Sequence, residues 1–111
     1  MDIVRHKIEV GSRLRMAIEA LGLSQTAAGR PFGVTAQKMG NWLRGDHYPD
    51  PWFIFNFCAR HPITADWIYL GRASGLTGEM GDALFAGASA SQAAQLEVEH
   101  QAQQTPAVGL P

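Results

Sequence analysis

The sequence predicts an all-helical fold, in which several short helices form one domain and a tail of different composition follows. Apolar residues recur every three or four positions through residues 1–71, as they do along the buried face of an α-helix. Residues typical of helix ends separate these segments, with Ser, Thr or Asp at expected starts and Gly or Pro at expected ends. A chain of 111 residues is long enough for one small domain with an appendage.

The first predicted helix has a continuous apolar stripe. The stripe consists of Ile8, Gly11, Leu14, Ile18 and Leu21. Gly22 follows the stripe directly, and a glycine just past the last helical residue is a common helix end. We therefore expect one helix that ends at Gly22.

The second helix and the turn after it contain several helix breakers. Ser24 is a good cap for a short helix, which Pro31 must end because proline has no N–H to donate. Gly29 leaves room for a crossing helix to approach closely, and Gly33 accepts the positive φ of a tight turn. The breakers therefore predict a packed corner between two helices.

A third helix follows, capped by Thr35 and ending near Arg44. Its inner positions are apolar, with Met39 and Trp42 three residues apart. The positions that must then face outward are Ala36, Gln37, Gly40 and Asn41.

Two more helices complete the predicted domain. Asp50–Pro51 is typical of a cap followed by a first-turn proline, and it opens the segment WFIFNFCARH. Thr64 caps a fifth helix, ADWIYL, which ends before Gly71. Aromatic residues surround most of the fourth helix, more than one small domain can bury. Trp52, Phe53 and Phe55 are therefore expected to form a dimer or partner interface, or to receive the segment that contains Met80, Leu84 and Phe85.

Residues 72–111 form an acidic tail of low complexity, which we expect to be partly ordered. Leu76, Met80 and Leu84 are four residues apart, with Phe85 beside the last, so they predict a short docking or dimerisation helix.

Charge is segregated along the chain, although the net charge is only −1. From Arg5 to Arg44 there are seven basic and two acidic residues, and from Gly45 to Pro111 there are two basic and seven acidic ones. A basic half of this kind is typical of a protein that binds a polyanion.

The sequence gives little support for a metal-binding protein, an enzyme or a membrane protein. The single cysteine, Cys58, excludes an internal disulfide, and with His61 it has no third or fourth metal ligand nearby in sequence. No nucleophile motif, phosphate-binding loop or acidic pair stands out, so we expect no enzyme, no cofactor and no metal. There is neither an apolar run of 18 residues nor the apolar stretch of a signal peptide, so we expect a cytoplasmic protein without a membrane partner.

Specific motifs resemble a known family. They are Leu23-Ser24-Gln25, Gly33-Val34-Thr35, Trp42, Arg44-Gly45 and Tyr48-Pro49. In this order they resemble the Xre-type, phage-repressor and Cro-like helix-turn-helix regulators, over roughly Ile8 to Gly71. The resemblance implies a five-helix, lambda-repressor-like helix-turn-helix domain in residues 1–71. Three features depart from the family pattern: Ala28-Gly29 stands where a large aliphatic residue and a small one are usual, Pro31 where a long polar residue is common, and Leu43 where a glutamate is common.

The resemblance also implies a DNA-binding surface on double-stranded DNA. The helix from Thr35 to Arg44 would enter the major groove. Its expected base-reading residues are Ala36, Gln37, Gly40 and Asn41, and side-chain amides suit the donor and acceptor of adenine. The expected phosphate contacts are Gln25, Thr35, Lys38, Arg44, Arg13 and Arg15.

Three functions remain open from the sequence. The first is a phage-type transcriptional repressor that binds a palindromic operator as a homodimer. The second is the antitoxin of a toxin–antitoxin pair, in which the tail or the fourth helix holds the toxin. The third is a protein-interaction module that does not bind DNA.

Overall fold

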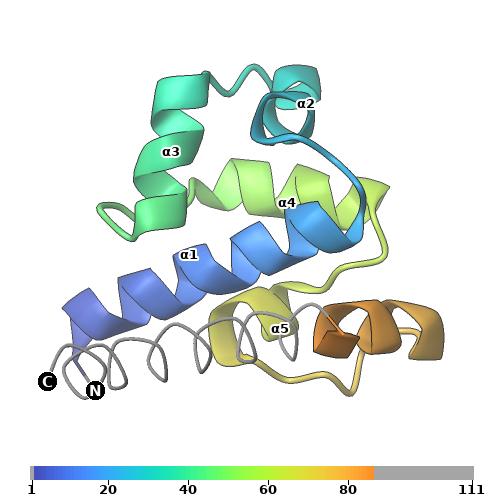
Figure 1. Cartoon of the computed structure of the whole chain (residues 1–111). Coiled ribbons are helices and arrows are strands. Elements are labelled where there is room, and N and C mark those ends of the chain that lie inside the picture. Colours follow the sequence, from blue (N-terminus) through green and yellow to red (C-terminus); the bar gives the residue numbers. More distant parts are fainter. Residues whose placement is uncertain (1, 87–111) are drawn as a thin grey trace, which may run out of the picture.

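The computed structural model describes residues 2–86, which contain helices and no strand. The helices are α1 (Ile3–Ala20), α2 (Gln25–Gly29), the 3-10 helix η1 (Arg30–Phe32), α3 (Ala36–Arg44), α4 (Pro51–Arg60) and α5 (Ala65–Leu70), and residues 78–86 are also helical. The long α1 runs through the middle, with α2, α3 and α4 on one side and α5 with residues 78–86 on the other (Figure 1). The predicted all-helical class is confirmed.

Helix α1 begins earlier than its apolar stripe suggests, because the Asp2 carboxylate accepts a hydrogen bond from the Val4 N–H at 3.0 Å. Its buried residues are Val10, Gly11, Leu14, Ala17 and Ile18. Ile8, predicted to belong to this stripe, is instead 52% exposed. Ile8 precedes Leu14 by six residues, which at 3.6 residues per turn places it about a third of a turn from the buried face.

The corner between α2 and α3 has the predicted construction. The Ser24 hydroxyl accepts a hydrogen bond from the Ala27 N–H at 3.0 Å, and Pro31 occupies the first turn of η1. Gly33 then turns the chain with a φ of +70°, and its N–H donates to the Arg30 carbonyl at 3.2 Å. A Cβ on Gly29 would lie 3.0 Å from the Val34 carbonyl oxygen, so its lack of a side chain permits this close approach.

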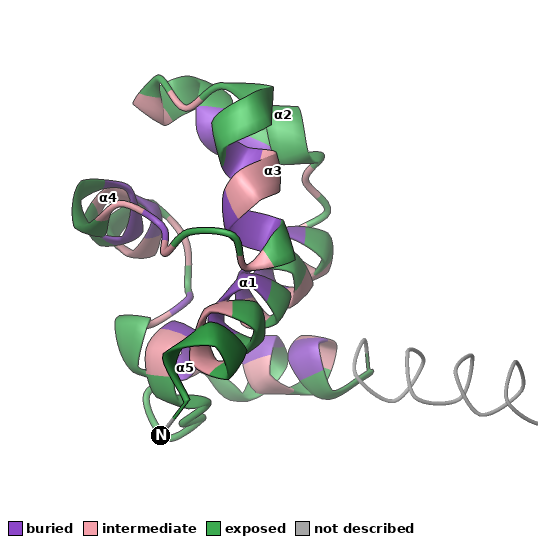
Figure 2. Ribbon diagram, turned by 90° about the vertical axis from the view of Figure 1, so that its left-hand side faces the viewer, coloured by how far each residue is buried: buried purple, intermediate pink, exposed green. Residues whose placement is uncertain are grey.

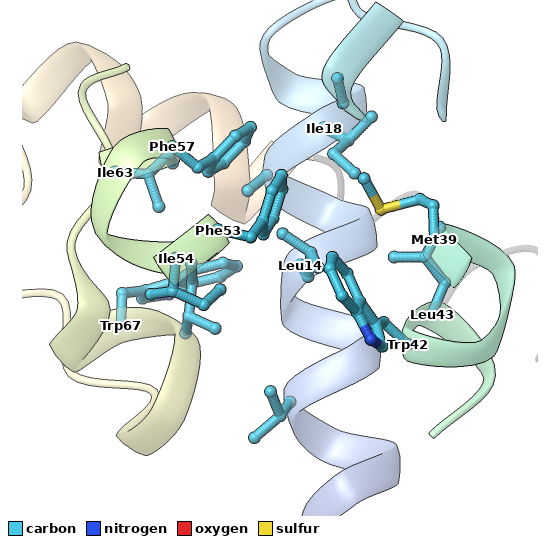
Figure 3. Close-up of a cluster of buried hydrophobic side chains, with 14 of the residues drawn as sticks. Leu14, Ile18, Met39, Trp42, Leu43, Phe53, Ile54, Phe57, Ile63 and Trp67 are labelled. Carbon is cyan, nitrogen blue, oxygen red and sulfur yellow. The ribbon is translucent and has the colours of Figure 1, made fainter. Parts of the chain in front are cut away.

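The core forms where α1, α3 and α4 meet. Phe53 is fully buried at its centre, with its ring centroid 5.1 Å from that of Trp42 and 5.3 Å from that of Phe57. Figure 3 shows Phe53 of α4 between Phe57 and the indole of Trp42 on α3. Leu43, the residue that departs from the family pattern, is 5% exposed and belongs to the same core. An apolar residue there is therefore explained by packing.

The helical residues 78–86 extend this core. The Thr77 hydroxyl accepts a hydrogen bond from the Met80 N–H at 3.2 Å, and Met80 and Leu84 are buried, whereas Phe85 is exposed. Leu84 shares an apolar pocket with Met16 of α1 and Trp67 of α5. This segment therefore packs beside α1 and α5 and leaves the outer side of α4 uncovered. The rest of the predicted tail, residues 87–111, lies outside the described residues.

Candidate nucleic-acid interface

Helix α3 has one buried and one outward face. Met39, Trp42 and Leu43 are buried in the core. The residues that face outward are Ala36, Gln37, Lys38 and Arg44, which are exposed, and Gly40 and Asn41, which are half-buried. Figure 2 shows the buried residues of α3 alternating with intermediate and exposed ones along the helix. We call Ala36, Gln37, Gly40, Asn41 and Arg44 the outer face of α3.

Two backbone features hold α3 in place. The Thr35 hydroxyl accepts a hydrogen bond from the Lys38 N–H at 3.1 Å, which confirms the predicted cap. A Cβ on Gly11 of α1 would collide with the Trp42 carbonyl oxygen and would lie 2.8 Å from that of Leu43. Because the backbones of α1 and α3 touch here, the orientation of the outer face is fixed by rigid groups.

The side chain of Arg44 lies over the outer face. Its Nε donates to Asp46 Oδ2 at 3.1 Å, and its Nη2 donates to the Asn41 side-chain oxygen. Its Nη1 would lie 3.1 Å from a Cβ added to Gly40. From the sequence, Arg44 is expected to contact a phosphate and Gly40 to lie against the bases. The structure places the guanidinium in the space that Gly40 leaves open.

Lys38 lies on the side of α3 that faces α4. Its Nζ is 2.9 Å from Asp50 Oδ2 and 5.9 Å from the centroid of the Trp42 ring. Asp50 occupies the predicted N-cap position of α4, but its side chain makes no capping hydrogen bond. The predicted helix start at Asp50–Pro51 is therefore confirmed, while the Asp50 carboxylate pairs with Lys38 and leaves the backbone N–H groups of α4 without a side-chain cap.

These pairs change the charge distribution expected from the sequence. Asp46 and Asp50 belong to the acidic half of the chain, yet both contact basic residues of α3. The sequence patterns do not indicate these two carboxylates as part of the site, although Arg44 and Asp46 are only two residues apart. All four side chains are about half exposed, and ion pairs of this kind contribute about 0–1 kcal/mol. A phosphate can therefore replace either carboxylate at small cost.

The other predicted phosphate contacts divide into two groups. Arg13 is used inside the fold: its Nε donates to the Ile68 carbonyl at 2.7 Å and its Nη2 to the Tyr69 carbonyl at 3.0 Å. Burial lowers the pKa of this guanidinium, an effect that Glu9 opposes. The assignment of Arg13 to DNA is therefore corrected, because its donors satisfy the carbonyl groups at the end of α5. Arg15 and Gln25, by contrast, are exposed.

The predicted aromatic interface on α4 is partly wrong. Phe53 is fully buried, whereas Trp52 is 60% and Phe55 73% exposed. Phe53, Ile54 and Phe57 are the buried residues of α4 and face the core, whereas Trp52 and Phe55 lie on other sides of the helix and remain exposed. A second exposed apolar group, which the sequence analysis did not single out, consists of Ile3, Val4 and Ile8 on α1.

The described part of the chain contains neither a set of metal ligands nor a membrane-spanning helix. Within residues 2–86, no three His, Cys, Asp or Glu side chains come together as a set of metal ligands. Cys58 is half-buried, and burial raises the pKa of its thiol. None of the helices described here is both long enough and apolar enough to cross a membrane.

Comparisons with known proteins were negative. No family model matches this chain, and neither a curated protein nor a solved structure matches it. The function is therefore inferred from the corner between α2 and α3 and from the outer face of α3.

Proposed function

We propose that this chain is a sequence-specific DNA-binding transcriptional regulator whose α3 enters the major groove. The observation that carries the proposal is the outer face of α3, whose polar and small side chains follow directly on a tight corner and include no carboxylate. A major groove about 12 Å wide admits one α-helix. The same contacts that bury Trp42 keep this face in solvent.

Each part of the face has a role in this proposal. Gln37 and Asn41 are one turn apart and present side-chain amides to base edges, and the Ala36 methyl group suits the methyl of thymine. Lys38 at the edge of α3 contacts a phosphate by exchanging the Asp50 carboxylate for it. Outside α3, the exposed residues Arg15 and Gln25 and the cap residue Thr35 are further phosphate contacts.

The proposal includes a homodimer. Trp52 and Phe55 expose apolar surface on α4, and a second copy of the chain would cover it. Two copies would place their recognition helices in successive major grooves, about 34 Å apart, on a palindromic operator. A cytoplasmic, phage-type repressor is the form of regulator that the motifs favour.

Selection of bound DNA from a random library tests the proposal. We expect enrichment of a palindrome with half-sites about one helical turn apart. Sedimentation of the pure protein should give a dimer, and replacing Trp52 and Phe55 together by serine should give a folded monomer that binds a single half-site weakly. Absence of any enriched sequence at low salt would contradict DNA recognition.

The exposure of Trp52 and Phe55 also favours a second candidate, a module that binds another protein through α4. In an antitoxin both surfaces are used, the outer face of α3 for an operator and α4 for a toxin. In a pure interaction module only α4 is used. A monomer that selects no DNA would support the pure module, and a dimer that selects a palindrome would support the regulator.

A further inference from the structure

The conformation of Arg44 bears on which base the outer face of α3 reads. Two of the five N–H groups of the guanidinium are engaged, one by Asp46 and one by the side-chain oxygen of Asn41. Within the described residues the other three have no acceptor, and two of them belong to Nη1, which lies above Gly40. The free donors of Arg44 are therefore available on the outer face.

The same contact changes what Asn41 offers to a base. An amide reads adenine by donating to N7 with a nitrogen hydrogen and accepting from N6 with its oxygen. The oxygen of Asn41 already accepts a hydrogen bond from Arg44. One of the two lone pairs of this oxygen is thereby occupied, so Asn41 and Arg44 together present five free N–H donors, two from Asn41 and three from Arg44, against one remaining acceptor site on the oxygen. Guanine matches such a surface because its major-groove edge carries two adjacent acceptors, O6 and N7.

We propose that Arg44 is a base-reading residue that selects guanine, and that Gly40 and Asp46 are its positioning residues. Gly40 supplies the space beside which the guanidinium lies, and Asp46 accepts a hydrogen bond from its Nε, which leaves both hydrogens of Nη1 and one of Nη2 free. The inference rests on the proposed DNA-binding function and deepens it. It predicts a guanine in each half-site, beside the bases that Gln37 contacts.

A comparison with Lys38 supports this assignment. Both residues are basic, lie on α3 and pair with a carboxylate of the following loop. Lys38 is directed toward α4, with its ammonium near Asp50 and the Trp42 ring, whereas Arg44 lies across Gly40 and Asn41. Lys38 thus suits a phosphate at the edge of the groove, and Arg44 suits a base within it.

The test measures affinity of the full chain for its selected operator and for every single-base change in one half-site. We expect one position at which guanine is preferred over the other bases by roughly 5- to 150-fold. Arg44→Ala should reduce this preference to less than about twofold while preferences at other positions persist. Lys38→Ala, the matched control, should weaken all sequences about equally.

Two further variants separate reading from folding. Gly40→Ala adds a Cβ only 3.1 Å from Nη1, so the guanidinium must shift, and the guanine preference should fall even though alanine is the better helix former. Replacing that guanine by 7-deazaguanine removes the N7 acceptor, so it should weaken the parent protein and have little effect on Arg44→Ala. Melting curves for each variant show that it is folded.

The contrary outcomes are distinct. If Arg44→Ala weakens all sequences equally and reduces the salt dependence as Lys38→Ala does, Arg44 is a phosphate contact and the inference is overturned, while the DNA-binding function stands. If the operator has no guanine whose preference depends on Arg44, the inference is also overturned. If the parent protein selects no DNA, both proposals fail.

Discussion

The two faces of α3 are held by different forces. On the inner face, Met39, Trp42 and Leu43 are removed from water and packed against α1 and α4. On the outer face, Arg44 is held by Asn41 and Asp46 through hydrogen bonds and an ion pair in solvent. Burial of a large apolar side chain contributes about 1.5–3 kcal/mol, whereas an exposed ion pair contributes about 0–1 kcal/mol. Packing therefore determines where the outer face lies, and weak exchangeable contacts determine which groups it presents.

The largest expected effect on stability comes from removing a buried side chain from the inner face of α3. Trp42→Ala should lower the free energy of unfolding by about 3–5 kcal/mol, because it removes a ring that is 2% exposed and packed on Phe53. DNA binding should be lost only to the extent that the protein unfolds. Chemical denaturation measures the change.

Trp52→Ala is the matched control for that experiment. Trp52 is 60% exposed in the single chain, so at protein concentrations too low for a dimer its removal should change the free energy of unfolding by no more than about 0.5 kcal/mol. Equal destabilisation by the two tryptophan variants would contradict the division of α3 and α4 into buried and exposed faces.

The second prediction compares two glycines on opposite sides of α3: Gly11 of α1, which lies against its inner face, and Gly40, which belongs to its outer face. Gly11→Ala should destabilise by about 1–3 kcal/mol, since the new Cβ would meet the backbone carbonyl groups of Trp42 and Leu43, which cannot turn aside. Gly40→Ala should instead stabilise the fold by up to about 1 kcal/mol, because its Cβ meets only the mobile end of Arg44. Thermal melting of both variants checks the signs, and a shift in the same direction for both would be inconsistent with this packing.

Sequence alone was sufficient for features set by local interactions. Ser24, Thr35 and Thr64 cap their helices as predicted, and Gly33 has the predicted positive φ, because each depends on neighbours within a few residues. The inner face of α3 followed from the spacing of Met39 and Trp42.

Features that depend on the relative placement of helices were beyond sequence patterns. Aromatic residues occur on most sides of α4, so the pattern did not reveal that Phe53 points into the core and Phe55 away from it. The destination of Arg13 depends on the end of α5, more than fifty residues further along the chain. Asp50 was predicted to cap α4, and only its distance from Lys38 shows the competing contact.

The third prediction concerns the bases. Gln37→Ala should weaken binding to the selected operator by about 1–3 kcal/mol and relax the preference at particular base pairs. The free energy of unfolding should stay within about 0.5 kcal/mol of the parent value, because Gln37 is exposed. Operator and random-sequence affinities, measured beside a melting curve, separate the two effects.

The control for Gln37 is Asn56→Ala, which removes an amide whose nitrogen donates to the Trp52 carbonyl within α4. It should leave the base preference unchanged. A folded Gln37→Ala protein with the full base preference of the parent would show that the reading surface lies elsewhere.

The smallest expected effect is at the edge of α3, where Lys38 and Asp50 form an exposed pair. Lys38→Ala should weaken all sequences about equally and flatten the slope of log K against log salt by about 1, because one phosphate fewer is neutralised.

Asp50→Asn should instead strengthen binding to all sequences and steepen that slope, because the Lys38 ammonium remains and loses its carboxylate partner. For both variants the free energy of unfolding should lie within about 1 kcal/mol of the parent value, as expected for an exposed pair. Titrations at three or more salt concentrations measure the slopes. An Asp50→Asn protein that binds every sequence more weakly would mean that Asp50 holds Lys38 in its binding position, and that the pair is not simply exchanged for a phosphate.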